Sequence, residues 1–382
     1  MKALTRFIPA AAAALAAAAF AAPAASAATN SAAGHDSGGG PGGVVFALND
    51  NTAGNAVAAY HRAPNGKLTQ AGVYRTGGLG GVLTGSVVDH TASQGGLAYD
   101  EAHGLLIAVN PGSDTVSVFR VHGDRLTLSQ VLSSGGDFPV SVSVHGDHAY
   151  VLNALGGGSL SGYRIAGQHL VPISGSQRAL NLGTTAASQF TATPGQVAFT
   201  PDGTRLLVTT KGATNAVDVF AVGPDGRLSA SPVVDSLPGA VPFAVAFDQA
   251  GHVALAEAGP SAIATFTLSR GGHLTQLDAA DTGQTATCWV VRAGQYFYTS
   301  NAGSGSVSGY TVGRSGGLTA LGNTTTDAGT VEAAAAGGRF VYVQTGKAGI
   351  VDEFAVGAGG ALTAIGSVTV PGGAGGEGIA AA

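Results

Sequence analysis

Amide and charged side chains recur at regular intervals in a sequence that has few ionisable residues. Only 10% of the 382 residues are charged. One recurring set lies where short apolar runs end, and it comprises Asn49, Asn110, Asn153, Lys211, Glu257, Asn301 and Thr345, with Gln344 beside the last. A second set lies where apolar runs begin, and it comprises Gln196, Trp289, Glu332 and Glu377. An ammonium group, carboxylates, amides and an indole can bind a small polar ligand if the fold gathers them in one concave place.

The spacing of these residues follows a repeat that consists of an aromatic residue, several further residues and Gly-x-Leu. Seven copies carry the aromatics Tyr60, Phe119, Tyr163, Phe220, Phe266, Tyr310 and Phe354. Their leucines are Leu68, Leu126, Leu170, Leu228, Leu274, Leu318 and Leu362, which lie 58, 44, 58, 46, 44 and 44 residues apart. A period near 44, with 62 glycines and few helix-forming segments, predicts an all-β, seven-bladed β-propeller.

One copy shows how a blade is built. In the stretch 195–229, QVAF forms the innermost strand a, RLLVTT strand b and NAVDVFAV strand c, and the residues after GPDGR carry strand d. Two Pro-Asp-Gly turns separate these strands, because proline presets one backbone angle and glycine accepts a positive φ. The alternation in AVDVFAV is typical of a sheet packed between two others.

The two ends of the repeat region predict a closed ring. The first copy starts directly at a strand b, Val44–Asn49, and Gly376–Ala382 lies where an eighth strand a would begin. We therefore expect residues 44–382 to form one propeller in which the C-terminal segment pairs with the N-terminal blade and removes the exposed edge. A linear solenoid is the alternative, but a solenoid would not need a C-terminal strand that completes the first repeat.

The N-terminal residues predict export. Residues 1–27 combine Lys2 and Arg6, an alanine-rich apolar stretch and an ASA cleavage site, which is typical of a secretory signal peptide. A membrane-spanning helix is the alternative, but Pro9 and Pro23 break the run. Residues 28–43 are rich in glycine and serine and predict a flexible linker. The expected product is secreted or extracellular and has no membrane span, and retention at the cell wall is an open alternative.

Composition also restricts the partners. The net charge of −5, without a cluster of basic residues, argues against nucleic acid. No spacing of ligating residues indicates a metal site, no motif indicates a cofactor, and the lone Cys288 is interpreted as a small buried apolar residue. The expected ligand is a small polar molecule or a glycan. We expect a monomer, because a closed ring leaves no strand edge that requires a partner.

Propeller geometry sorts the polar residues onto two ends. The d–a connections and b–c loops lie at one end of the channel, and the a–b and c–d turns lie at the other. Two d–a connections, 76–95 and 174–195, are each about 14 residues longer than the 44-residue repeat requires. Such loops either bind ligands or are neutral insertions. His90 lies in the first of them, whereas His103, His122, His148, His169, His252 and His273 lie in turns and are interpreted as solvated.

The sequence of the repeats resembles that of the lactonase family of seven-bladed propellers, which includes 6-phosphogluconolactonase and carboxymuconate cyclase-type proteins. The similarity covers nearly all of 44–382 and is clearest in FTPDGTRLLVTTKGATNAVDVFAVGPDGRLS and YFYTSNAGSGSVSGYTVGRSGGLT. Glu257 and Lys211 match charged positions of the family at the ends of strands b. The family's Arg-His pair is replaced by Phe243 and Ala244, and Gly195 and Gln196 stand where a further histidine is expected.

The resemblance implies a site for lactone chemistry at the channel mouth. Lactone hydrolysis requires a base that activates water and a donor that stabilises the developing oxyanion. Glu257, Glu332 or His90 would supply the base, and Lys211 the donor. The substrate-binding set would be Gln196, Asn110, Asn153, Asn301, Trp289 and Glu377. Two alternatives for these residues remain open. In one, the asparagines serve only to hydrogen-bond the b–c turns. In the other, the propeller is a non-catalytic extracellular module that binds a glycan or protein.

Overall fold

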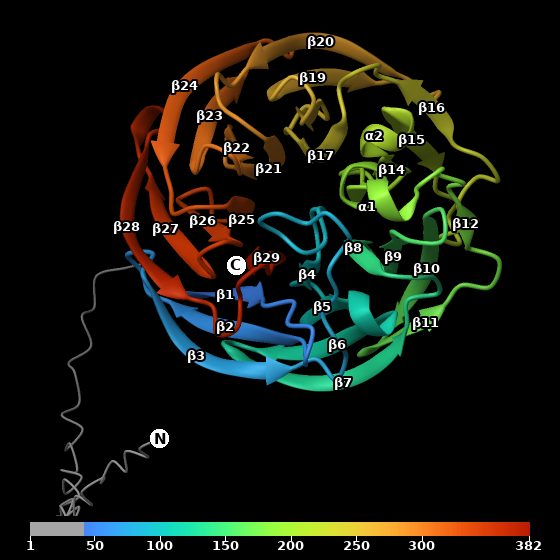
Figure 1. Ribbon diagram of the computed structural model, residues 1–382, viewed down its shortest axis with the longest axis horizontal. Helices are drawn as coiled ribbons and strands as arrows, with labels where there is room; N and C mark the ends of the chain where they lie inside the picture. The colour runs from blue at the N-terminus through green and yellow to red at the C-terminus, as the bar shows by residue number, and fades with distance from the viewer. Residues whose placement is uncertain (1–41) are drawn as a thin grey trace, which may run out of the picture. The chain divides into compact units, whose positions relative to one another are not determined.

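The computed structural model describes residues 42–382, so the predicted signal peptide and most of the predicted linker lie outside the described residues. The described chain forms seven antiparallel sheets arranged around one axis, which confirms the predicted propeller (Figure 1). No helix in 42–382 is long and apolar enough to cross a membrane.

Each sheet contains four strands that run from the channel to the outside in the predicted order a to d, and the sheet of blade 3 has a short fifth strand. From inner to outer, the strands are β29 (Ile379–Ala381), β1 (Gly43–Leu48), β2 (Ala56–Arg62) and β3 (Leu68–Arg75) in blade 1; β4 (Leu97–Asp100), β5 (Leu105–Asn110), β6 (Thr115–His122) and β7 (Arg125–Ser133) in blade 2; β8 (Pro139–His145), β9 (His148–Asn153), β10 (Ser159–Ala166) and β11 (His169–Pro172) in blade 3; β13 (Gln196–Phe199), β14 (Arg205–Thr209), β15 (Ala216–Ala221) and β16 (Val233–Ser236) in blade 4; β17 (Pro242–Phe247), β18 (Val253–Glu257), β19 (Ala262–Leu268) and β20 (Leu274–Asp281) in blade 5; β21 (Thr287–Ala293), β22 (Tyr296–Asn301), β23 (Ser306–Val312) and β24 (Leu318–Thr325) in blade 6; and β25 (Thr330–Ala336), β26 (Phe340–Thr345), β27 (Ile350–Val356) and β28 (Leu362–Thr369) in blade 7.

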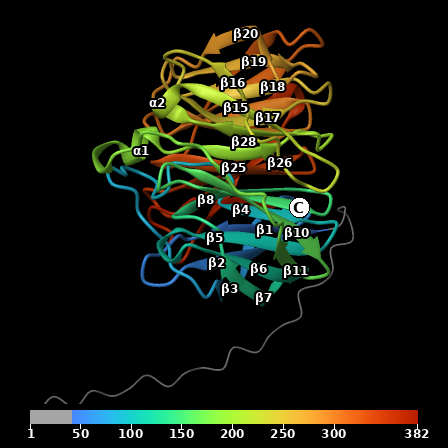
Figure 2. The same cartoon turned by 90° about the vertical axis from the view of Figure 1, so that its right-hand side faces the viewer.

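The remaining elements are short. They are β12 (Arg178–Ala179), which pairs with β10, the helices α1 (Gln189–Ala192) and α2 (Lys211–Thr214), and the 3-10 turns at Pro111–Ser113, Ala186–Ser188 and Ala358–Gly360. Figure 2 shows α1 and α2 at one end of the ring and the C-terminus toward the other. We call the end with the b–c loops and d–a connections the mouth end, and the end with the a–b and c–d turns the turn end.

The ring closes through the predicted C-terminal strand. β29 pairs antiparallel with β1, with Phe46 opposite Ala380 and Ala47 opposite Ile379. The backbone groups of Val44 and Ala382 exchange two further hydrogen bonds of 3.2 and 3.0 Å. This pairing satisfies the inner edge of blade 1, which would otherwise expose a row of backbone donors and acceptors.

The glycine of the repeated Gly-x-Leu brings adjacent blades together. Tyr342 in strand b of blade 7 donates a hydrogen bond of 2.7 Å to the carbonyl oxygen of Gly66, in the c–d turn of blade 1. Tyr150 makes the equivalent bond of 2.7 Å to Gly226 in the next blade. Both glycines have a positive φ, and a Cβ atom on either would lie within 2.3 Å of a neighbouring ring. Glycine is therefore required at these two turns both for its backbone angle and for the close approach.

Candidate functional site

The first long connection fills the mouth end of the channel. We call residues 76–96, which join β3 to β4, the plug; Figure 1 shows this cyan segment reaching over the centre of the ring. Gln94 exchanges two hydrogen bonds with the backbone of Val290 in blade 6, of 3.1 and 3.0 Å. The hydroxyl of Ser141 in blade 3 donates to the carbonyl oxygen of Gln94 at 2.6 Å. The plug is thus fixed to blades on opposite sides of the channel.

Lys211 joins the plug to the second long connection. Its Nζ donates hydrogen bonds to the carbonyl oxygens of Ala92 (2.7 Å) and Phe190 (3.0 Å) and to Oγ1 of Thr193 (3.1 Å). An ammonium group has three protons, so this set uses every donor. Nζ also lies 5.3 Å from the ring centroid of Phe243, the residue that replaces the family's arginine. Burial lowers the pKa of Lys211 to about 8.

Glu377 accepts hydrogen bonds from the plug. Its Oε1 accepts from the hydroxyl of Thr91 and from the backbone nitrogen (2.9 Å) and hydroxyl (2.7 Å) of Ser93. Asp89, also in the plug, is a second buried carboxyl group whose charge acts on Glu377. Burial and the neighbouring negative charge raise the pKa of Glu377, and burial raises that of Asp89. Both shifts favour the protonated forms of these carboxyl groups.

Glu332 and Trp289 contact the same segment. The backbone nitrogen of Gly95 donates to Oε1 of Glu332 at 2.9 Å, and burial raises the pKa of Glu332 to about 8. The indole nitrogen of Trp289 donates to the carbonyl oxygen of Ser93 at 2.5 Å. The fold thus gathers Lys211, Glu332, Trp289 and Glu377 around the channel, but it covers them with the plug instead of presenting them to solvent.

His90 differs from these residues because a fifth of its side chain, 21%, is exposed. Its Nδ1 makes a hydrogen bond of 3.2 Å with the backbone carbonyl oxygen of Asp50, a buried residue in the b–c loop of blade 1, and lies 3.3 Å from Oδ2 of the same residue. Burial raises the pKa of Asp50 to about 6, and the hydrogen bond with Asp50 raises the pKa of His90. The ring packs against Gly375, where a Cβ atom would overlap Nε2. A histidine oriented by a buried carboxylate is an arrangement that can transfer protons.

Glu257 lies apart from this group. It lines a separate pocket of 490 Å³ between blades 4 and 5, together with the turn Pro238–Ala240, Pro260 and Gln276. Burial raises the pKa of Glu257. Within the described chain, Glu257 and Lys211 form no ion pair, so the two positions that match the family do not constitute one site.

The amides are engaged within the protein. The side-chain nitrogen of Asn301 donates to the hydroxyls of Ser306 and Ser308, and that of Asn110 donates to those of Thr115 and Ser117. Asn153 donates to the carbonyl oxygen of Ser134 and to the hydroxyl of Ser159, and the backbone nitrogen of Val245 donates to Oε1 of Gln196. These bonds stabilise the ends of strands and link adjacent blades.

Asp50 and Asp89 are the ionisable residues at the mouth that sequence reasoning missed. Asp89 immediately precedes His90 in VVDHT, and an acidic residue in a long connection was the available signal. Asp50 directly follows the predicted strand Val44–Asn49 and gave no signal of its own. In 42–382, no three His, Cys, Asp or Glu side chains are grouped in a way that could hold a metal ion.

Comparisons with known proteins agree with the fold and the resemblance. A family model described as "Lactonase, 7-bladed beta-propeller" matches residues 84–256. The periplasmic gluconolactonase PpgL of Pseudomonas aeruginosa superimposes with a TM-score of 0.70 at 18% identity, covering 89% of this chain and 99% of that one. A candidate 6-phosphogluconolactonase of Bacteroides fragilis gives 0.70 and 18%, covering 89% and 98%. Virginiamycin B lyase of Staphylococcus aureus gives 0.53 and 12%, covering 73% and 86%. No curated protein matches the sequence. The resemblance to the lactonase family is confirmed, and the structural likenesses establish the fold.

Proposed function

We propose that this lactonase-like propeller hydrolyses a small lactone or sugar lactone at the mouth end, with His90 as the base. The observation that carries the proposal is the His90–Asp50 pair, because it combines a partly exposed imidazole with a buried carboxylate 3.3 Å away. The match to the lactonase family model over 84–256, a range that includes His90, supports the same reaction class.

The chemistry follows from the two side chains. His90 removes a proton from water, and the resulting hydroxide attacks the lactone carbonyl carbon. The tetrahedral intermediate collapses by breaking the ring C–O bond, and the imidazolium returns its proton to the leaving alkoxide to give a hydroxy acid. Asp50 orients the ring and stabilises the imidazolium. Lys211 does not serve as the oxyanion donor while the plug is in place, because its three protons are already donated.

Titration of the acid released from aldonolactones at constant pH tests this proposal. Replacing His90→Gln should lower kcat/KM by about 10²- to 10⁴-fold, the range typical of general-base catalysis. His122→Gln, at the turn end, is the matched control and should retain the wild-type rate. Glu257→Gln tests the alternative base in the separate pocket. If His90→Gln hydrolyses every lactone as fast as the wild type, His90 is not the base.

A non-catalytic binding propeller is the second candidate function. The observation that favours it is that Lys211, Glu332 and Glu377 are buried and each is hydrogen-bonded to the plug. Under this alternative, the protein would bind a glycan or protein at the mouth end and release no acid from any lactone above the rate of buffer.

We further propose that the protein is exported and monomeric. The signal-like residues 1–27 support export, and the pairing of β29 with β1 supports a monomer because it leaves no open inner edge. Finding uncleaved Met1 on protein recovered from cells would contradict export. A dimer mass in light scattering would contradict the monomer.

A further inference from the structure

Positive charge gathers at the turn end of the propeller. If each turn is taken with three strand residues on either side, the turn end holds eleven of the fifteen Lys and Arg residues in 42–382 but only eight of the 21 acidic residues. The turn end therefore carries a formal charge of +3, and the remainder of the described chain carries −9. Eight of the nine described histidines lie at the turn end as well. Such a separation attracts anions to one end of the molecule.

Within this end, three pockets join into one furrow. A pocket of 410 Å³ lies between the turns of blades 4 and 5. It shares Asp202 and Thr204 with a pocket of 390 Å³ toward blade 3, and Asp248 and Gln249 with a pocket of 240 Å³ toward blade 6. We call this row of three adjoining pockets across blades 3 to 6 the furrow. Its extended shape fits a chain-like ligand better than a compact one.

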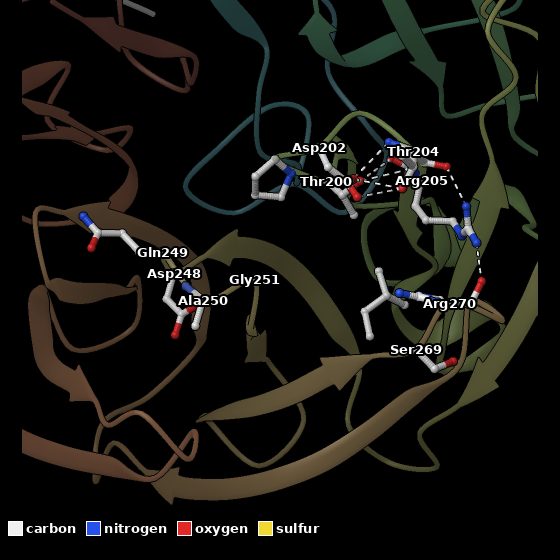
Figure 3. A pocket seen from close by; sticks show the side chains of 12 residues that line it. Thr200, Asp202, Thr204, Arg205, Asp248, Gln249, Ala250, Gly251, Ser269 and Arg270 are labelled. Carbon is white, nitrogen blue, oxygen red and sulfur yellow. Dashed lines mark hydrogen bonds between the residues drawn. The ribbon is translucent and has the colours of Figure 1, made fainter.

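The lining of the furrow is basic. Its arginines are Arg205, Arg270, Arg292 and Arg314, and its histidines are His145 and His148. Of the apolar residues Phe199, Leu268 and Phe297, only Leu268 is partly exposed. Figure 3 shows Arg205 and Arg270 on one side of the central pocket, opposite Asp248 and Gln249.

The two aspartates of the furrow are engaged by their own turns. Oδ1 of Asp202 accepts hydrogen bonds from the hydroxyl of Thr200 and from the backbone nitrogen of Thr204. Asp248 accepts two backbone bonds of 2.8 Å at Oδ1 and pairs with His252 at 2.7 Å through Oδ2. Their carboxylates therefore compete weakly with an incoming anion for the arginines.

Two of the arginines are available to a ligand. Arg270 and Arg314 are exposed, and neither guanidinium group donates a hydrogen bond to another residue of 42–382. Guanidinium groups bind carboxylate and phosphate in a bidentate manner. We propose that the furrow binds an acidic polysaccharide, a glycan chain whose successive carboxylate or phosphate groups bind Arg270 in the central pocket and Arg314 in the pocket toward blade 6. This site is at the opposite end from His90 and is separate from the proposed hydrolase site.

Calorimetric titration of the purified protein with polygalacturonate, at low and high salt, tests the proposal. The wild type should bind polygalacturonate but not neutral dextran, and the affinity should fall as salt rises. The double variant Arg270→Glu/Arg314→Glu should bind at least about tenfold more weakly. Arg75→Glu/Lys347→Glu, on exposed residues outside the turn end, changes the net charge equally and should retain the wild-type affinity.

Three results would overturn the proposal. One is no binding of polygalacturonate by the wild type. Another is an equal loss of affinity in both double variants, which would assign the binding to net charge and not to the furrow. The third is tighter binding of duplex DNA or of phosphatidylglycerol vesicles with the same dependence on Arg270 and Arg314, which would assign the furrow to a different partner. Thermal unfolding confirms that each variant is folded before titration.

Discussion

Each proton of the Lys211 ammonium group has its own acceptor, and two of these acceptors are carbonyl oxygens of long connections. Burying a charge is costly unless it is fully hydrogen-bonded, so this arrangement is what allows a lysine to be 1% exposed. A residue that matches a charged position of the lactonase family thus holds two loops together in this protein. Its role at this scale is structural.

Replacing Lys211→Met should therefore destabilise the protein. The variant keeps the length of the side chain but leaves the carbonyl oxygens of Ala92 and Phe190 without their donor, and we expect a loss of about 3 kcal/mol in the free energy of unfolding. Urea denaturation followed by fluorescence measures the loss. Lys347→Met, at an exposed position, is the control and should change the value by less than about 0.5 kcal/mol. A loss below about 1 kcal/mol for Lys211→Met would show that the hydrogen bonds of Lys211 contribute little to stability.

At the scale of elements, the strands could be predicted from sequence but the path of the plug could not. Each Gly-x-Leu copy marks a turn between two strands that are adjacent in the chain, such as the turn at Gly66. The spacing of these copies was therefore enough to predict the strand order and the closure of the ring. The plug has no periodicity, and its position depends on contacts between residues far apart in the chain, such as Gln94 with Val290. Lys211, Glu332 and Glu377 are hydrogen-bonded to the plug, and their burial depends on that unpredictable path.

The plug also gives stability an unusual dependence on pH. Burial raises the pKa of Glu332 from an ordinary 4.5 to about 8, so the folded state binds more protons than the unfolded state between these values. Stability is then complete below about pH 4.5 and falls as the pH rises toward 8. We expect the melting temperature to be lower at pH 8.5 than at pH 5.

Glu332→Gln isolates this effect, because the amide oxygen can still accept the hydrogen bond from Gly95 but does not ionise. The variant should melt close to the wild type at pH 5 and above it at pH 8.5, as measured by calorimetry. Asp50, Asp89 and Glu377 have pKa values raised in the same direction, so the variant should reduce the pH dependence without abolishing it. A variant that follows the wild type at both pH values would contradict the assignment to Glu332.

At the scale of the whole molecule, seven similar sheets depend on one short strand for closure. Without β29, the backbone of Val45–Ala47 would lose its partner, and the buried Glu377 that anchors the plug lies just before that strand. The last seven residues should therefore contribute more to stability than an average segment of their length.

Removing residues 376–382 should cause aggregation or a large drop in melting temperature, because it exposes a strand edge. Ile379→Ala is the milder test if the truncated protein does not fold. Ile379 is 4% exposed, and its truncation should cost about 2–4 kcal/mol in chemical denaturation. An unchanged melting temperature for the truncated protein would mean that the ring closes without β29.

The exchange of hydrogen bonds between Val44 and Ala382 places both ends of the described chain at the turn end. A fusion partner or a surface linkage attached after Ala382, or ahead of Gly42, would therefore hold the propeller by its basic side. The mouth end, which carries His90, would then face outward, into the medium. For a catalyst fixed on a bead, this orientation leaves the reactive side unobstructed and hides the furrow against the support.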